Sequence, residues 1–257
     1  MSLPLIRSQL LGGIEGIQHG FTTRLGGVST GLFSSLNCSP FSGDDNKAIE
    51  ENRRLISSEL GAHALVTNRQ VHGTRVRLID PDSDLNQGIE ADAIVTRGKG
   101  LCIAALGADC APVLFADPMH KIIGVAHVGW RGAVDGVVDA VVGKMEELGA
   151  MRPSIHCCIG PAIQSKSYEV GKDFRSDLVT TSEHGLDACF KVNSDTGNVH
   201  FDLPKYIEKR LKDQGLELID RREEDTYSDE ERFFSYRRAC HQGEKLYGRQ
   251  VGAICLS

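Results

Sequence analysis

Three separate segments of the chain each contain one side chain of a type that binds zinc. The side chains are those of His72, Cys110 and His127, and each lies where an apolar run meets a turn. They are too far apart in sequence for one helix or one zinc knuckle to hold them. Two imidazoles and one thiolate suit zinc, and three protein ligands leave a fourth position open, as in catalytic sites. The residue types therefore predict metal-assisted catalysis rather than a structural metal site.

Short apolar runs bounded by turn residues predict buried strands that would position these ligands. Cys110 follows the strand predicted over residues 101–106, and His127 lies near the end of the strand predicted over residues 122–128. We therefore expect both ligands at the ends of neighbouring strands, where the backbone is held stiffly. The predicted strands span residues 101–106, 113–115, 122–128, 155–159 and 250–256.

Apolar periodicity and end signals also predict several helices. Asp44 or Asp45 would cap the first helix and Gly61 would end it. Because strands and helices are mixed without regular alternation, we expect a single α/β domain over residues 1–257, with a mixed sheet flanked by helices. The predicted helices span residues 46–60, 133–148, 170–179 and 203–213, and residues 220–232 are expected to form a solvated loop or short helix.

The composition limits the classes of partner. The chain has 29 basic and 35 acidic residues, which disfavours a nucleic-acid or anionic-membrane binder. No apolar stretch approaches the length of a membrane span, and no signal-peptide pattern is present. The eight cysteines lack the paired spacing of a disulfide scaffold, which favours a cytoplasmic location. Nothing in the sequence predicts a particular oligomeric state.

Further polar residues adjoin these segments. Asp109 precedes Cys110 and would orient a ligand or contact substrate, unless it only caps a turn. Arg131 leads into the helix predicted from residue 133, whose N-terminus would suit an anion. Arg24 precedes a Gly-Gly turn, and the pair Arg237-Arg238 adds a third basic point. The alternative for each arginine is a surface charge that balances the acidic excess.

An ordered set of short motifs covers nearly the whole chain, from about Gly20 to Ile254. The motifs are Phe21-Thr22-Thr23-Arg24-Leu25-Gly26-Gly27-Val28-Ser29, Leu36-Asn37, Gln70-Val71-His72-Gly73, Ala91-Asp92-Ala93-Ile94-Val95-Thr96, Ala108-Asp109-Cys110, Ala126-His127-Val128-Gly129-Trp130-Arg131-Gly132, Ile159-Gly160-Pro161-Ala162-Ile163, Phe234-Ser235-Tyr236-Arg237-Arg238 and Gly248-Arg249-Gln250. Together they resemble the bacterial YfiH family, also called peptidoglycan editing factors or laccase-domain polyphenol oxidases, whose fold is similar to that of a bacterial toxin deamidase.

The resemblance implies a zinc enzyme that acts on purine nucleosides with phosphate. It places the family's zinc ligands on His72, Cys110 and His127. The implied reactions are phosphorolysis of adenosine, inosine and 5′-methylthioadenosine, and hydrolytic deamination of adenosine. The residues expected to serve them are Asp109 and Glu169 in catalysis and Arg24, Asn37 and Arg131 in binding substrate or phosphate. Glu169 has the alternative of an exposed carboxylate at a helix start.

Two other activities are alternatives. The first is a Cys/His hydrolase that edits peptidoglycan precursors, with Cys110 as nucleophile and His127 as base. The second is the multicopper oxidase that the family's older name suggests. The chain has nine histidines and no His-x-His pair, which is too few ligands for a coupled copper centre. We therefore expect copper only as an adventitious occupant of the zinc site.

Overall fold

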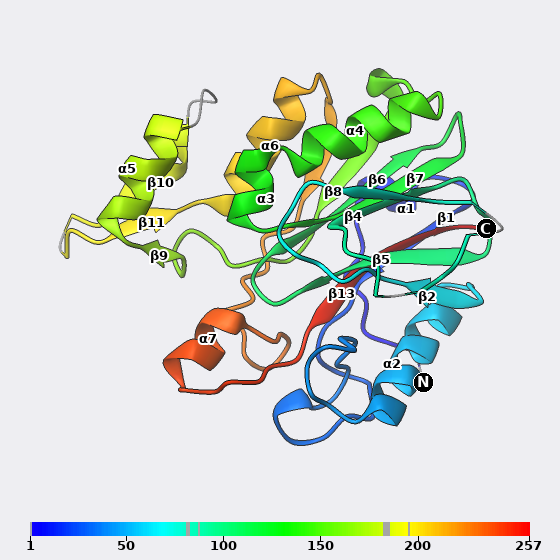
Figure 1. Ribbon diagram of the computed structural model, residues 1–257, viewed down its shortest axis with the longest axis horizontal. Helices are drawn as coiled ribbons and strands as arrows, with labels where there is room; N and C mark the ends of the chain where they lie inside the picture. The colour runs from blue at the N-terminus through cyan, green and yellow to red at the C-terminus, as the bar shows by residue number, and fades with distance from the viewer. Residues whose placement is uncertain (1, 81–82, 87, 182–185, 195) are drawn as a thin grey trace.

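The computed structural model describes residues 2–80, 83–86, 88–181, 186–194 and 196–257. Two β-sheets stack face to face, and helices cover their outer faces (Figure 1). Strand directions are mixed in both sheets, so the mixed α/β fold predicted from the sequence is confirmed. Among the described residues, every helix is too short or too polar to cross a bilayer.

The six-stranded sheet carries two of the predicted ligands. Its central strands β6 and β7 pair antiparallel and are buried along their whole length. Alternate residues serve two cores, so Val113 packs toward the helices while Leu114 packs toward the other sheet. The strands, in spatial order, are β12 (Leu218–Arg221), β8 (His156–Ile159), β6 (Ala111–Asp117), β7 (Ile122–Val128), β4 (Ala93–Thr96) and β3 (Val76–Ile79).

The four-stranded sheet covers the inner face of the first one. Residues such as Ile103 and Ile254 meet Leu114 and Val125 in the core between the sheets. Helix α2 (Asn46–Glu59) covers the outer face, with Asp45 as its N-cap and Gly61 just beyond its end, as predicted. The strands are, in order, β1 (Ile17–Phe21), β13 (Gln250–Leu256), β5 (Leu101–Gly107) and β2 (Ala64–Val66).

The helix predicted over residues 133–148 is two helices. Helix α3 (Trp130–Asp135) ends at Gly136, whose φ of +98° breaks the helix before α4 (Val137–Glu147) begins. Arg210 stabilises the break, because its guanidinium donates to the carbonyls of Ala133 and Val134 and pairs with Asp139. Helices α3, α4 and α6 (Leu203–Asp213) cover the outer face of the six-stranded sheet (Figure 1).

A small three-stranded sheet and α5 form a lobe beside α6 (Figure 1). The helix predicted over residues 170–179 begins later, because Glu169 and Val170 form strand β9. The lobe consists of β9 (Glu169–Val170), α5 (Lys172–Thr181), β10 (Phe190–Val192) and β11 (Val199–Phe201). Short helices elsewhere are α1 (Gln9–Gly12) and α7 (Tyr236–His241), and single 3₁₀ turns span Gly31–Phe33, Arg152–Ser154 and Leu186–Cys189.

Two sequence predictions about strands need correction. Residues 220–232 were expected to be loop or short helix, but Asp220 and Arg221 belong to β12, which pairs parallel to β8 at the sheet edge. The strands that carry Cys110 and His127 were expected to be neighbours, with residues 101–106 delivering Cys110. Instead β5 belongs to the other sheet, and Cys110 directly precedes β6, which is the neighbour of β7 in the six-stranded sheet.

Candidate metal centre and its cavity

The three predicted ligands converge in the structure. One ligand atom from each of His72, Cys110 and His127 lies within 4.8 Å of the others. Cys110 directly precedes β6, His127 is the penultimate residue of β7, and His72 projects from the loop between β2 and β3. The β6–β7 pairing therefore fixes two ligands, and a loop from another part of the chain brings the third.

Asp92 organises this group, although sequence reasoning assigned it no role. Its carboxylate accepts hydrogen bonds from the backbone N–H groups of Val71, His72 and Gly73, at 2.8–3.1 Å. It also lies 2.9 Å from Nδ1 of His127. One buried carboxylate thus ties the His72 loop to β7 and orients an imidazole, as in carboxylate–histidine–zinc sites. The sequence signal was an aspartate directly before the short, wholly buried strand β4.

Two further residues, Gln70 and Gly129, shape the ligand group. Gln70 exchanges two hydrogen bonds of 2.8 Å with the backbone of Leu106, which ties the loop to β5. The backbone of Gly129 lies against the group, and a Cβ there would lie only 2.7 Å from Nδ1 of His72 and 3.0 Å from Sγ of Cys110. The glycine of the His-Val-Gly-Trp motif therefore leaves the space that the ligand side chains need.

The protonation of the histidines reflects these contacts. Burial by itself lowers the pKa of His127, but the neighbouring Cys110 and Asp92 outweigh it and raise the pKa to about 9. Burial and the charges of His127, Arg131 and Arg249 lower the pKa of His72, although Asp92 opposes them. Burial opposes ionisation of Asp92, yet its hydrogen bonds with His127 and the backbone hold its pKa below the usual value. A metal would compete with the proton on His127, since ligating imidazoles are neutral.

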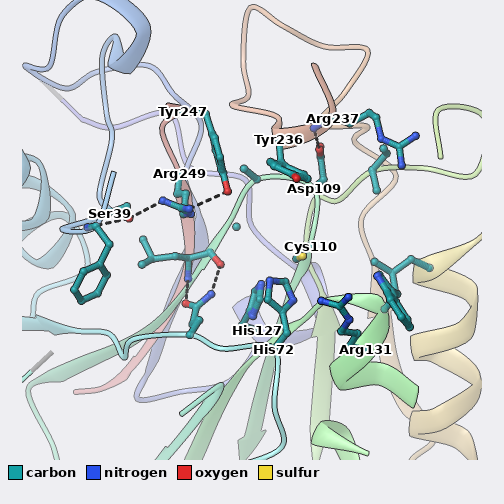
Figure 2. Close-up of a pocket in the computed structure, with 18 of the residues that line it drawn as sticks. Ser39, His72, Asp109, Cys110, His127, Arg131, Tyr236, Arg237, Tyr247 and Arg249 are labelled. Atoms are coloured by element: carbon teal, nitrogen blue, oxygen red, sulfur yellow. Dashed lines mark hydrogen bonds between the residues drawn. The ribbon is translucent and has the colours of Figure 1, made fainter. Parts of the chain in front are cut away.

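The group lies in a cavity of about 950 Å³ (Figure 2). A volume of this size is typical of a small-ligand site. Aromatic and basic side chains both line it, a mixture suited to a ligand with a flat ring and an anionic group. The lining includes Phe41, Trp130, Tyr168, Tyr236 and Tyr247 together with Arg69, Arg131, Arg237 and Arg249.

Arg131 lies in the cavity, but not at the long helix expected for it. The residue belongs to the six-residue helix α3, which begins at Trp130 and is too short for a strong N-terminal dipole. Its guanidinium lies 4.9 Å from the ring centre of Trp130. Within the described part of the chain Arg131 makes no hydrogen bond or ion pair, so an exposed, unpaired charge faces the cavity.

Arg24 and Asn37 lie outside this cavity. Arg24 donates to the carbonyls of Ser34 and Glu230 and lines a separate, smaller cavity of about 160 Å³ that Arg238 also lines. Asn37 is completely buried, and its side-chain oxygen accepts from the backbone N–H of Arg249 at 3.0 Å. The structure therefore brings neither side chain to the ligand group. The Arg237-Arg238 pair splits, with Arg237 in the large cavity and Arg238 in the small one.

Asp109 and Glu169 differ in their positions. Asp109 lines the cavity but is only 7% exposed, and its carboxylate accepts from the hydroxyls of Thr226 and Ser235 and the backbone N–H of Arg237. This arrangement anchors α7 to the Cys110 turn and favours a positioning role. The exposed side chain of Glu169 accepts from Asn198, outside the cavity, because Glu169 is in β9 rather than at a helix start.

Solved structures share this fold over almost the whole chain. A Neisseria meningitidis protein described as a member of family DUF152 covers 100% of both chains, with a TM-score of 0.84 and 27% sequence identity. YfiH of Bacillus licheniformis covers 94% of this chain and 93% of its own, with a TM-score of 0.85 and 28% identity. The fold thus defines a YfiH-type protein.

The sequence comparisons agree. The chain belongs to the family described as multi-copper polyphenol oxidoreductase laccase, whose sequence model matches residues 18–257. It is 35% identical to a purine nucleoside phosphorylase of Corynebacterium glutamicum, over 93% of this chain and 94% of that protein. A purine nucleoside phosphorylase of Streptomyces coelicolor is 34% identical over 95% of this chain and 97% of its own length. The resemblance to the YfiH family inferred from the motifs is confirmed.

Proposed function

We propose that this protein is a zinc-dependent purine nucleoside phosphorylase. The observation that carries the proposal is the convergence of His72, Cys110 and His127 on one wall of a cavity that also holds an unpaired arginine. Relatives named purine nucleoside phosphorylase, aligned over nearly the whole chain, support the substrate class. The proposed substrates are adenosine, inosine and 5′-methylthioadenosine with orthophosphate, and adenosine deamination is proposed as a second reaction.

The donor set fits zinc. One thiolate and two imidazoles match its preferred ligands, the Asp92 contact orients His127, and Gly129 leaves the group open. Among the described residues, this is the one group of three or more potential ligand side chains, whereas a coupled multicopper centre needs several. When bound there, zinc would supply a Lewis acid for phosphorolysis and would lower the pKa of a water for deamination.

The chain's own residues would bind and orient the reactants. Arg131 would hold the phosphate, and Trp130 and Tyr236 would exclude water and pack against the nucleoside. In phosphorolysis a phosphate oxygen bonds to C1′ of the ribose as the bond from C1′ to the purine nitrogen breaks. The electron pair leaves with the purine, which takes up a proton. Asp109 would act by holding Arg237 and α7 in place.

The same geometry is also compatible with one alternative function, that of a Cys/His hydrolase, which can be tested. Cys110 lies close enough to His127 to raise the pKa of the imidazole. A Cys/His hydrolase also places its cysteine beside its histidine in this way. A thiolate that coordinates zinc is a poor nucleophile, so the two functions require different states of Cys110.

Metal content and activity should be linked in the purified protein. We expect about one zinc per chain when the protein is prepared without added metal, as one three-residue ligand group predicts. Inosine should yield hypoxanthine only when orthophosphate is present, and a chelator should abolish this activity until zinc is returned. Elemental analysis and chromatography of the products measure both quantities. Phosphate-independent release of hypoxanthine would contradict phosphorolysis.

Replacing Arg131 with methionine should weaken the use of phosphate. The KM for phosphate in inosine phosphorolysis should rise about 10- to 100-fold, because charge-assisted hydrogen bonds contribute roughly 1.5–3 kcal/mol each. Zinc content should not change. Arg54→Met is the matched control, since Arg54 lies on α2 outside the cavity and pairs with Glu51. An unchanged KM for phosphate in Arg131→Met would remove Arg131 from the site.

A further inference from the structure

Arg249 is a second cavity arginine whose backbone is fixed from both sides. Its N–H donates to the side-chain oxygen of buried Asn37 at 3.0 Å, and its carbonyl accepts from the N–H of Cys38 at 3.1 Å. Asn37 is itself held by Ser42 and Asp44. Arg249 also stands directly before β13, the second strand of the four-stranded sheet. The start of its side chain is therefore anchored to the fold.

The guanidinium of Arg249 is also oriented. One terminal nitrogen donates to Oγ of Ser39 at 3.0 Å, and the other donates to the hydroxyl of Tyr247 at 2.9 Å (Figure 2). Its central carbon lies 4.5 Å from the centre of the Tyr247 ring. Ser39 is almost fully buried, so this partner cannot easily move. A long, flexible side chain is thus held in one direction without any charged partner.

The charge of Arg249 is not neutralised. In the part of the chain that the structure describes, Arg249 makes no ion pair, whereas Arg69 on the same cavity pairs with Glu90 at 3.3 Å. Arg237, the fourth arginine that lines the cavity, donates a hydrogen bond to the carbonyl of Glu169 at 2.8 Å. Figure 2 places Arg249 with Ser39 and Tyr247 on one side of the His72, Cys110 and His127 group, and Arg131 on the other. Two unpaired guanidinium groups therefore flank the metal centre.

A fixed and uncompensated guanidinium in a cavity matches a phosphoryl group, which accepts two parallel N–H donors. The cavity volume of about 950 Å³ is near the upper end of the range of roughly 300–1,000 Å³ for small-ligand sites. A nucleoside with one phosphate does not require that much space. The cavity therefore has room for a second anionic group.

We propose that Arg249, with Ser39 and Tyr247, forms a second phosphoryl-binding subsite, separate from the one at Arg131. The proposal rests on the proposed function for the identity of the nucleoside, but not for the recognition of the phosphoryl group. Two sources supply this chemistry. One is the phosphate ester of a purine nucleoside monophosphate, and the other is free orthophosphate.

The test compares Arg249→Met with Arg69→Met, which removes a cavity arginine already paired with Glu90. Calorimetric titration of the zinc-loaded protein measures the binding of inosine, inosine 5′-monophosphate and orthophosphate separately. In Arg249→Met the affinity for one of the two phosphoryl ligands should fall about 10- to 100-fold, as expected for loss of charge-assisted hydrogen bonds. Inosine binding should stay unchanged, and Arg69→Met should bind all three as the wild type does.

The pattern of losses identifies the source. Weaker binding of inosine 5′-monophosphate with normal orthophosphate binding assigns the subsite to a phosphate ester, and the reverse assigns it to free phosphate. Ser39→Ala should give a smaller loss in the same direction, because it removes one partner that orients Arg249. Unchanged binding of both anions, or an equal loss for inosine itself, would overturn the proposal. Absence of inosine phosphorolysis in the wild type would refute the proposed function but leave these titrations decisive.

Discussion

Replacing Cys110 with alanine should remove most of the bound zinc and abolish inosine phosphorolysis. Loss of a residue beside the ligands usually costs about 10–100-fold in metal affinity, and loss of a ligand should cost more than about 100-fold. His72→Ala and His127→Ala should have the same effect, because three ligand atoms share one site. Zinc content by elemental analysis and kcat/KM for inosine measure the two outcomes.

Alkylation separates a ligand from a nucleophile at Cys110. Zinc-loaded protein should resist iodoacetamide at this residue, because coordination occupies the thiolate, and chelation should expose it. Cys240 is the internal control, since its exposed thiol belongs to no ligand group and should react in both states. A Cys/His hydrolase would behave in the opposite way: it would stay active after a chelator removes the metal, and alkylation of Cys110 would abolish its activity. Full zinc retention in all three alanine variants would place the metal elsewhere.

Replacing Asp92 with alanine should damage both the metal site and the fold. Three part-buried backbone N–H groups of the His72 loop would lose their acceptor, and each lost hydrogen bond should cost roughly 0.5–1.5 kcal/mol or somewhat more, because the acceptor is charged. His127 would lose the partner that orients its ring, which should lower zinc affinity by about 10–100-fold. Thermal unfolding of the metal-free protein and zinc titration measure the two effects separately.

Asp117 provides a matched control for Asp92. It is also a fully buried carboxylate, and it accepts backbone N–H groups of Met119, His120 and Met151. It lies at the far end of β6 from Cys110 and does not line the cavity. Asp117→Ala should therefore lower the unfolding temperature while zinc affinity stays normal. Equal zinc affinity in both variants would show that Asp92 has no role at the metal site.

Asp92 should make the free energy of unfolding of this protein decrease as the pH falls into the acid range. Its pKa is below the unfolded value, because His127 and the backbone N–H groups outweigh the effect of burial. A carboxylate of this kind contributes stability above its unfolded pKa of about 3.9, and the contribution is lost as the pH falls through the lower folded value. The difference in stability between wild type and Asp92→Ala should accordingly shrink in acid.

Much of the fold followed from local patterns in the sequence. The runs that became β7, β13 and α6 were predicted with their observed bounds, because apolar periodicity and end signals are properties of neighbouring residues. The break at Gly136 was not predicted. Valines on either side continue an apolar helical face, whereas the contact that Arg210 makes with the end of α3 is long-range and is not visible in the local sequence.

The candidate site likewise combines features that the sequence predicted with features that only the structure shows. The sequence by itself determined which residue types suit a metal, and the structure brings those at positions 72, 110 and 127 together. Only the tertiary structure decided that Asp92 orients His127, that Arg24 faces another cavity, and that Arg249 faces this one. The physical reason is that a ligand type is a property of one side chain. The partner of a buried carboxylate or an arginine depends instead on which distant segments pack against it, and here those segments come from two different sheets and the loops between them.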